Sequence, residues 1–153
     1  MKRKLPAETH CFTYYDANPK HKKTGDCVIR ALATAMNKSW DEVLTDLYNY
    51  AMKYKQMLND DVLYKKYLKD QGWVMLKQPR KHDNTKYTGI EFCEELHEGT
   101  CFKIGGYEFA EWDNIIAHIG GHHIVAIIDG KIADTWNSGG GCIGNIWIKV
   151  NKE

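Results

Sequence analysis

Apolar residues are arranged in two ways along the chain, at helical spacing through most of the first two thirds and in compact runs in the last third. The first stretch, residues 28–36, is apolar except for Arg30 and Thr34, which predicts a helix buried on nearly all sides. A polar turn with Gly25 precedes it, and Asp26 is a candidate N-cap. We therefore expect a core helix whose first turn begins at Cys27.

Three further segments combine a capping residue with apolar positions at three- and four-residue spacing, which predicts amphipathic helices. They lie at residues 39–51, 60–71 and 88–98. The first begins with Ser39 and Glu42, the two residues of a capping box. The other two stop at Gly72 and Gly99, and glycine suits the left-handed conformation that ends many helices.

Shorter apolar runs bounded by turn residues predict strands. These runs lie at residues 11–15, 73–76, 100–104 and 143–150. The segment 105–121, which has a pair of glycines at each end, has a less regular pattern. There we expect a short helix over residues 111–119.

The clearest local signal is a hairpin centred on Asp129-Gly130, a dipeptide that favours a two-residue turn. Apolar runs at residues 123–128 and 131–136 flank it. Side chains alternate between the faces of a strand, so this register places His123, Asp134 and Trp136 on the same side. We expect His123 and Asp134 to be diagonal neighbours.

Composition narrows the class of protein. The 153 residues suit a single domain, 1–153, with a full hydrophobic core. The formal net charge is +1 at pH 7, so no overall field favours nucleic acid or a membrane surface. Two lysine-rich clusters, at residues 2–4 and 20–23, are expected in solvated loops. Nucleic-acid binding through them is the weakest functional hypothesis.

The cysteines and the apolar runs indicate the cellular compartment of the protein. Five cysteines, an odd number without a close pair, favour reduced thiols over a disulfide framework, and no zinc-type pair occurs. No run resembles a secretory leader or reaches the ~20 apolar residues of a membrane span. His122 and His123 are adjacent, so they face opposite sides of a strand, which argues against a shared metal ion. We expect a cytoplasmic protein of a bacterium or a phage-infected cell, without metal or other cofactor.

Three residues have the chemistry of a thiol acyl-transfer site. Cys27 lies where backbone N–H groups and the helix dipole favour the thiolate, which is the nucleophile. His123 is expected to hold the proton and return it to a leaving amine, and Asp134 to orient the imidazole. Asn137 is an alternative third member, and Trp136 is expected to shield the site. The competing interpretation is that the cysteine and histidine are ordinary core residues.

The order of cysteine helix, further helices, sheet histidine and sheet acid resembles the papain-like cysteine peptidase superfamily. Asp26-Cys27 opening a buried helix is similar to NlpC-type cell-wall peptidases and bacteriocin-leader peptidases. The blocks at residues 25–31, 39–43 and 134–139 most closely resemble a group of short phage and bacterial proteins. The resemblance implies an α+β fold, in which an N-terminal helical half carrying the thiol packs on a C-terminal antiparallel sheet carrying the histidine and the acid.

The resemblance also implies an oxyanion hole and an activity. Where papain-like peptidases usually have a glutamine for that hole, this chain has His21, with Thr24 nearby, and these side chains are the candidates. The implied function is a cysteine-dependent hydrolase or acyltransferase acting on an amide in a peptide, an isopeptide or a glutamine side chain. Its partner would be a peptide or protein substrate. The alternative is a catalytically idle papain-like fold that binds a host defence or regulatory protein.

Overall fold

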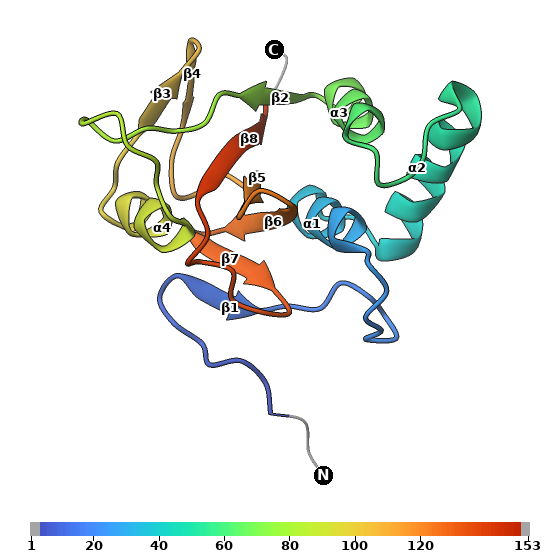
Figure 1. Cartoon of the computed structure of the whole chain (residues 1–153), viewed down its shortest axis with the longest axis horizontal. Coiled ribbons are helices and arrows are strands. Elements are labelled where there is room, and N and C mark those ends of the chain that lie inside the picture. Colours follow the sequence, from blue (N-terminus) through green and yellow to red (C-terminus); the bar gives the residue numbers. More distant parts are fainter. Residues whose placement is uncertain (1–3, 151–153) are drawn as a thin grey trace.

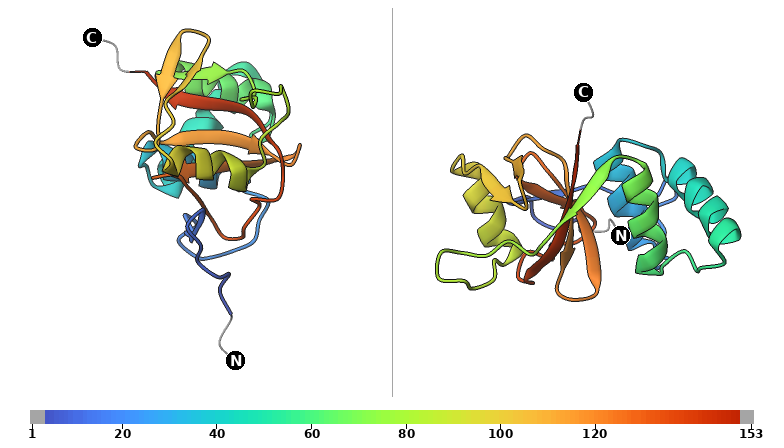
Figure 2. Two further views of the ribbon diagram at one scale, coloured as in Figure 1. Left: turned by 90° about the vertical axis from the view of Figure 1, so that its left-hand side faces the viewer. Right: turned by 90° about the horizontal axis from the view of Figure 1, so that it is seen from above.

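The computed structural model describes residues 4–150, which form three layers (Figures 1 and 2). A six-stranded sheet occupies the centre. On one side lie the helices α1 (Cys27–Met36), α2 (Trp40–Tyr54) and α3 (Asp61–Asp70). On the other side lie helix α4 (Gly89–His97) and a hairpin of β3 (Phe102–Ile104) and β4 (Tyr107–Phe109).

The central sheet consists of β1 (Phe12–Tyr14), β2 (Trp73–Leu76), β5 (Ile115–Ile119), β6 (His123–Ile128), β7 (Lys131–Asp134) and β8 (Ile143–Lys149). Its strand order is β1-β7-β6-β5-β8-β2, and every pair is antiparallel except β1 with β7, which is parallel. The α+β class is as expected. The expectation of a purely antiparallel, C-terminal sheet is wrong, because both edge strands come from the N-terminal half. Most of the chain separates β1 from β7, and such a long connection permits parallel pairing.

Helix α1 is buried on nearly all sides, as its composition predicts. It packs against β6 of the sheet and against α2. Val28, Leu32 and Ala35 belong to the core cluster on this side, together with Ile124 and Ala126 of β6. Cys27, Arg30 and Thr34 form a partly open stripe of α1, and Met36 is partly open at its last position.

Side-chain caps mark the starts of the other three helices. The Ser39 hydroxyl accepts from the Glu42 N–H at 3.0 Å, and the Thr88 hydroxyl accepts from the Glu91 N–H at 3.2 Å, each within a complete capping box. Asp60 caps α3. The predicted helix starts are therefore confirmed.

The helix expected over residues 111–119 is wrong, since β5 lies there. Ile115, Ala117 and Ile119 face one core cluster and Ile116 faces the other, and all four are fully buried. β5 is flanked by β6 and β8, and the sheet is covered on both faces. A strand buried on both faces lacks the alternation that distinguishes a half-buried strand from a buried helix.

The hairpin is confirmed in its register. Ile127 pairs with Ile132 and Ala126 with Ala133, and Asp129 and Gly130 both have positive φ, at 51° and 72°. Positive φ at both central residues is what a type I′ turn requires. β7 ends at Asp134, so the residues after it turn away from regular pairing.

In the part of the chain that the structure describes, no helix is both long and apolar enough to cross a membrane.

Candidate active site

The candidate nucleophile, Cys27, is the first residue of α1 and is partly exposed. Gly25 turns the chain just before it with a φ of +63°, a conformation that favours glycine. Asp26 occupies the N-cap position, but its side chain makes no capping hydrogen bond. The predicted side-chain cap is therefore wrong. The first N–H groups of α1 have no side-chain acceptor and are available to a group bound beside Cys27.

His123 begins β6 and Asp134 ends β7, so the hairpin brings the two side chains together. Nε2 of His123 lies 2.8 Å from Oδ2 of Asp134. The Asp134 side chain is 8% exposed, and its Oδ1 accepts from the N–H of Thr135 at 2.7 Å. This is the diagonal contact that the hairpin register predicts.

Cys27 lines the same hollow as His123. Because Nε2 faces Asp134, Nδ1 is the ring nitrogen available to the thiol. Burial lowers the pKa of His123, but the hydrogen bond and charge of Asp134, together with the nearby Cys27, outweigh burial and raise it to about 9. At neutral pH, His123 is therefore an imidazolium between the sulfur and the carboxylate.

The residues after Asp134 form a wall beside the imidazole. The ring of Trp136 lies 4.9 Å from that of His123, centroid to centroid, with one face open to solvent. Asn137 is engaged elsewhere, since its Oδ1 accepts from the N–H of Gly139 at 2.9 Å. Asp134, rather than Asn137, is thus the partner of His123. Ser138 lines a neighbouring hollow with Trp136, and its buried hydroxyl has no hydrogen-bond partner among the described residues.

A polar network holds the turn that precedes Cys27. The Arg30 Nε donates to Oδ1 of Asp26 at 2.7 Å. Trp40 Nε1 and Asn18 Nδ2 donate to Oδ2 of Asp26 at 2.8 and 3.2 Å. Arg30 also forms an ion pair with Asp16. The chain on both sides of the turn is thereby tied to α1.

This network also neutralises a charge that would disfavour a thiolate. Burial raises the pKa of Asp26, but the hydrogen bonds from its three partners outweigh burial and hold the pKa below its usual range. Asp26 is therefore ionised next to Cys27. The guanidinium of Arg30, whose side chain is 12% exposed, offsets that negative charge. The sequence alone left this conflict open.

The two candidate oxyanion donors, His21 and Thr24, differ in their position relative to Cys27. Nδ1 of His21 lies 3.1 Å from Oδ2 of Asp16, and the His21 side chain is 69% exposed. His21 does not line either hollow beside Cys27. Thr24 lines the hollow that Cys27 shares with His123. The side chain of Thr24 and the N–H of Cys27 are the donors that remain for an oxyanion.

Cys27 lies between two hollows. One, of about 300 Å³, is lined by the catalytic candidates His123 and Asp134, together with Trp136. The other, of about 430 Å³, extends toward α3 and is lined by Asp61, Tyr64 and His118, among others. A substrate chain can therefore extend away from the sulfur in two directions.

Tyr64 and His118 form an uncharged polar part of the lining of the second hollow, beside the carboxylate of Asp61. The hydroxyl of Tyr64 lies 2.8 Å from Nε2 of His118. Burial raises the pKa of Tyr64 to about 12, and burial lowers the pKa of His118. Both groups are consequently uncharged at neutral pH, and they offer hydrogen bonds without a net charge.

Sequence reasoning missed four residues that shape the site: Arg30, Trp40, Tyr64 and His118. The four-residue spacing of Asp26 and Arg30 on a helix was a usable signal. The other contacts join residues 14 positions apart, for Trp40 with Asp26, and 54 apart, for Tyr64 with His118. No local pattern in the sequence indicates pairs of that kind.

Comparison with known proteins adds no relative: no family model matches the chain, and no curated protein or solved structure matches it either. The function is therefore argued from the geometry of the site.

Among residues 4–150, one group of metal-ligating side chains is close enough together to hold an ion. It consists of His10, Cys11 and Glu94 and does not include Cys27.

Proposed function

We propose that the protein is a cysteine-dependent hydrolase or acyltransferase that acts on an amide. The observation that carries this proposal is the position of His123, which is hydrogen-bonded to Asp134 and lines one hollow with Cys27. A thiolate, an imidazolium and a carboxylate in that order are the parts that thiol acyl transfer requires. The raised pKa of His123 supports an imidazolium beside the sulfur at neutral pH.

The three side chains would act in sequence. The Cys27 sulfur attacks the amide carbon, so a C–S bond forms and the carbonyl oxygen becomes an oxyanion. His123 then donates its Nδ1 proton to the leaving nitrogen as the C–N bond breaks, which leaves a thioester and a neutral imidazole. Water or an amine next attacks the thioester while His123 takes its proton. The product leaves, and the thiolate and imidazolium are restored.

The beginning of α1 is suited to the oxyanion formed in this reaction. The Cys27 N–H lies at a helix N-terminus without a side-chain cap, so it is a fixed donor near the reacting carbon. The Thr24 hydroxyl borders the same hollow. These donors would replace the glutamine of papain-like enzymes, to which the chain has a resemblance in its Asp26-Cys27 block.

The substrate would be a peptide, an isopeptide or a glutamine side chain of a protein. Each supplies a planar amide, and only the leaving amine and the acyl acceptor differ between hydrolysis, deamidation and transamidation. The two hollows on either side of Cys27 support an extended substrate that passes over the sulfur.

The location of His21 favours a second function. That side chain binds Asp16 rather than lining the hollows, so the usual side-chain oxyanion donor is missing from its expected place. An idle papain-like fold that binds a host protein would have no need of such a donor. In that case Cys27 would have no special reactivity.

The reactivity of Cys27 tests the proposal. Iodoacetamide alkylation of each cysteine is followed by peptide mass spectrometry between about pH 5 and pH 9, a range that spans the ordinary thiol and imidazole values. We expect selective alkylation of Cys27 well below the range in which the exposed Cys101 reacts. His123→Ala should abolish that selectivity, while His82→Ala, at an exposed position, should retain it.

Two outcomes would contradict the enzyme hypothesis. Cys27 could react no faster than Cys101 at any pH, or its selectivity could survive His123→Ala in a protein that still folds. Either result would favour the binding module, and the search would turn to protein partners.

A further inference from the structure

A second cluster of reactive side chains lies where the segment before β1 meets α4. This cluster is on the opposite face of the sheet from α1 (Figure 2). β1 pairs with β7 so that Phe12 is opposite Ile132 and Tyr14 is opposite Asp134. Cys11 is therefore near the end of β7 that is farther from Asp134. The inference drawn from this cluster is independent of the proposed acyl transfer.

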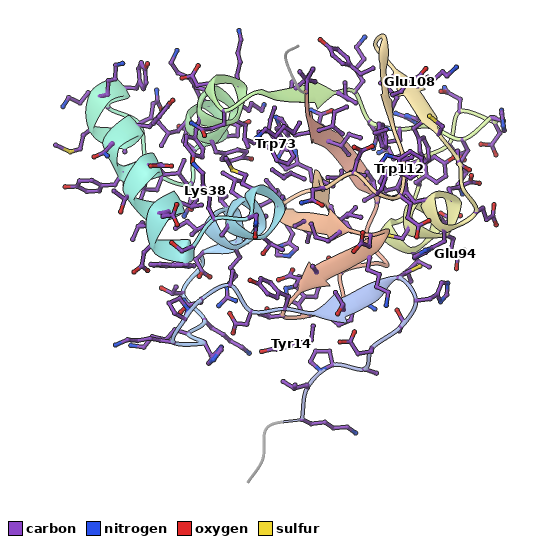
Figure 3. All side chains as sticks on the ribbon, turned by 180° about the vertical axis from the view of Figure 1, so that it is seen from behind. Tyr14, Lys38, Trp73, Glu94, Glu108 and Trp112 are labelled. Carbon is purple, nitrogen blue, oxygen red and sulfur yellow. The ribbon has the colours of Figure 1, made fainter. Side chains whose placement is uncertain are left out.

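Three different ligand atoms converge in the cluster. The Cys11 sulfur, a ring nitrogen of His10 and a carboxylate oxygen of Glu94 all lie within 4.8 Å of one another. Nε2 of His10 is 3.6 Å from Oε1 of Glu94. Glu94, labelled in Figure 3, comes from α4, whereas the other two ligands precede β1.

The main chain holds these side chains in place. The Cys11 N–H donates to the Thr9 hydroxyl at 3.1 Å, and the Cys11 carbonyl accepts from the Ile132 N–H at 2.9 Å. His97, one turn after Glu94 on α4, has its Nε2 2.6 Å from the carbonyl oxygen of His10. Nδ1 of His97 faces Glu111 at 3.2 Å, which fixes the ring. Glu94 is therefore placed by a helix, and the turn that carries His10 and Cys11 is tied by hydrogen bonds to β7 and α4.

The three ligand atoms lie close enough together for one cation to contact all of them. Cys11 is 3% exposed, and its thiol donates a long hydrogen bond of 3.7 Å to the Ile90 carbonyl. A divalent cation can bind a thiolate and a carboxylate together, because it supplies the positive charge that both require.

We propose that His10, Cys11 and Glu94 form a zinc-binding site that clips the segment before β1 to α4. One sulfur, one imidazole nitrogen and one carboxylate oxygen are ligands that zinc accepts in tetrahedral coordination, with water as the fourth. On binding, the Cys11 thiol loses its proton to solvent. The ion joins two elements that are distant in sequence, so it stabilises the folded chain over the unfolded one.

Cobalt(II) is the probe, because it takes the place of zinc and its bond to a thiolate absorbs in the near ultraviolet. The titration uses Cys27→Ser protein, which removes the competing thiol next to His123. We expect one equivalent of cobalt to give the thiolate band and one equivalent of zinc to abolish it. Adding Cys11→Ser should eliminate the band, whereas adding Cys101→Ser, the matched exposed cysteine, should leave it unchanged.

Two surface substitutions keep the test valid if Cys11→Ser fails to fold. His10→Ala and Glu94→Gln alter exposed side chains, and each should weaken cobalt binding by at least about tenfold. Zinc should also raise the melting temperature of Cys27→Ser protein, and Glu94→Gln should reduce that increase.

Three results would overturn the proposal. The first is no thiolate band in the Cys27→Ser protein. The second is a band that Cys101→Ser removes and Cys11→Ser retains. The third is cobalt affinity unaffected by both His10→Ala and Glu94→Gln. Because the titration is carried out without Cys27, none of these results bears on acyl transfer.

Discussion

The helices α1 and α4 pack on opposite faces of one sheet and begin in opposite ways. The first N–H groups of α4 are fully used: Gly89 and Ile90 donate to the carbonyls of Gly141 and Gly139, and Glu91 donates to the Thr88 hydroxyl. The start of α1 has no side-chain cap. Its turn is held instead from the outside, by Arg30 and Trp40 acting on Asp26. Of these two helices, α1 is therefore the one with donors free at its start, where a substrate oxyanion could use them.

The cysteine in each helix follows the same contrast. Cys27 occupies the first position of α1, beside an imidazolium. Cys93 lies in the middle of α4 and is fully buried, and burial raises its pKa to about 12. One sheet thus supports a partly exposed thiol beside an imidazole and a buried thiol that packs in the core.

Removing each thiol in turn should separate these roles, and this is the largest effect we expect. Cys27→Ala should lower the rate of acyl transfer from an activated ester such as p-nitrophenyl acetate by about a thousandfold or more, with little change in stability. Cys93→Ala leaves a small cavity in the core and should cost about 1 kcal/mol of unfolding free energy, with the ester reaction retained. Stopped-flow release of p-nitrophenol and urea denaturation provide the two measurements.

The comparison would be contradicted if one substitution caused both the loss of reaction and the loss of stability, or if the two effects were exchanged. An ester reaction that persists in Cys27→Ala and disappears in folded Cys93→Ala would transfer the nucleophile to α4. The contrast between the two helices would then have no functional meaning.

Local sequence signals predicted most of the fold because the forces behind them act over a few residues. The capping boxes at Ser39 and Thr88 and the turn at Asp129-Gly130 are set by short-range hydrogen bonds and backbone conformation. β5 was mistaken for a helix, since burial on both of its faces depends on strands and helices elsewhere in the chain. The parallel pairing of β1 with β7 was not predicted either, because it also depends on contacts between distant parts of the chain.

In the candidate site, too, local contacts could be predicted from the sequence and long-range contacts could not. His123 and Asp134 could be paired from the sequence because they lie on one hairpin, and their contact follows from its register. The side-chain cap assigned to Asp26 was wrong because Trp40 and Asn18, from other parts of the chain, compete for its carboxylate. Tyr64 and His118 line the second hollow for the same reason, since their contact exists only in the folded chain.

The second prediction concerns substitutions that disrupt the start of α1 or of α4. Arg30→Met leaves Asp16 and Asp26, whose side chains are 6% exposed, without their cation, and should cost about 3 kcal/mol of unfolding free energy. Thr88→Ala removes only a cap from α4 and should cost about 1 kcal/mol. Urea denaturation at neutral pH measures both variants.

Arg30→Lys is the matched control, because it retains the charge but loses the forked geometry, and it should fall between Arg30→Met and the wild type. Alkylation of Cys27 should also slow in Arg30→Met, since Asp26 is then left uncompensated beside the thiolate. Equal costs for Arg30→Met and Thr88→Ala would show that the two helix starts are held by comparable forces, and the comparison would fail.

The third prediction concerns the charge of His123, which lines a hollow with Cys27 at the start of α1. The pKa of His123 is raised from 6.5 to about 9 in the folded protein, so the folded state binds this proton more tightly than the unfolded state. Its contribution to stability, on the order of 3 kcal/mol, is complete below about pH 6.5 and is lost as the pH rises through about 9. The difference in unfolding free energy between the wild type and His123→Gln should therefore shrink across that range, as followed by urea denaturation at several pH values. The decline should be smaller in a Cys27→Ser background, because the sulfur supplies part of the shift. A difference that stays constant from neutral to alkaline pH would mean that His123 is uncharged beside Cys27, and the thiolate–imidazolium pair would have to be abandoned.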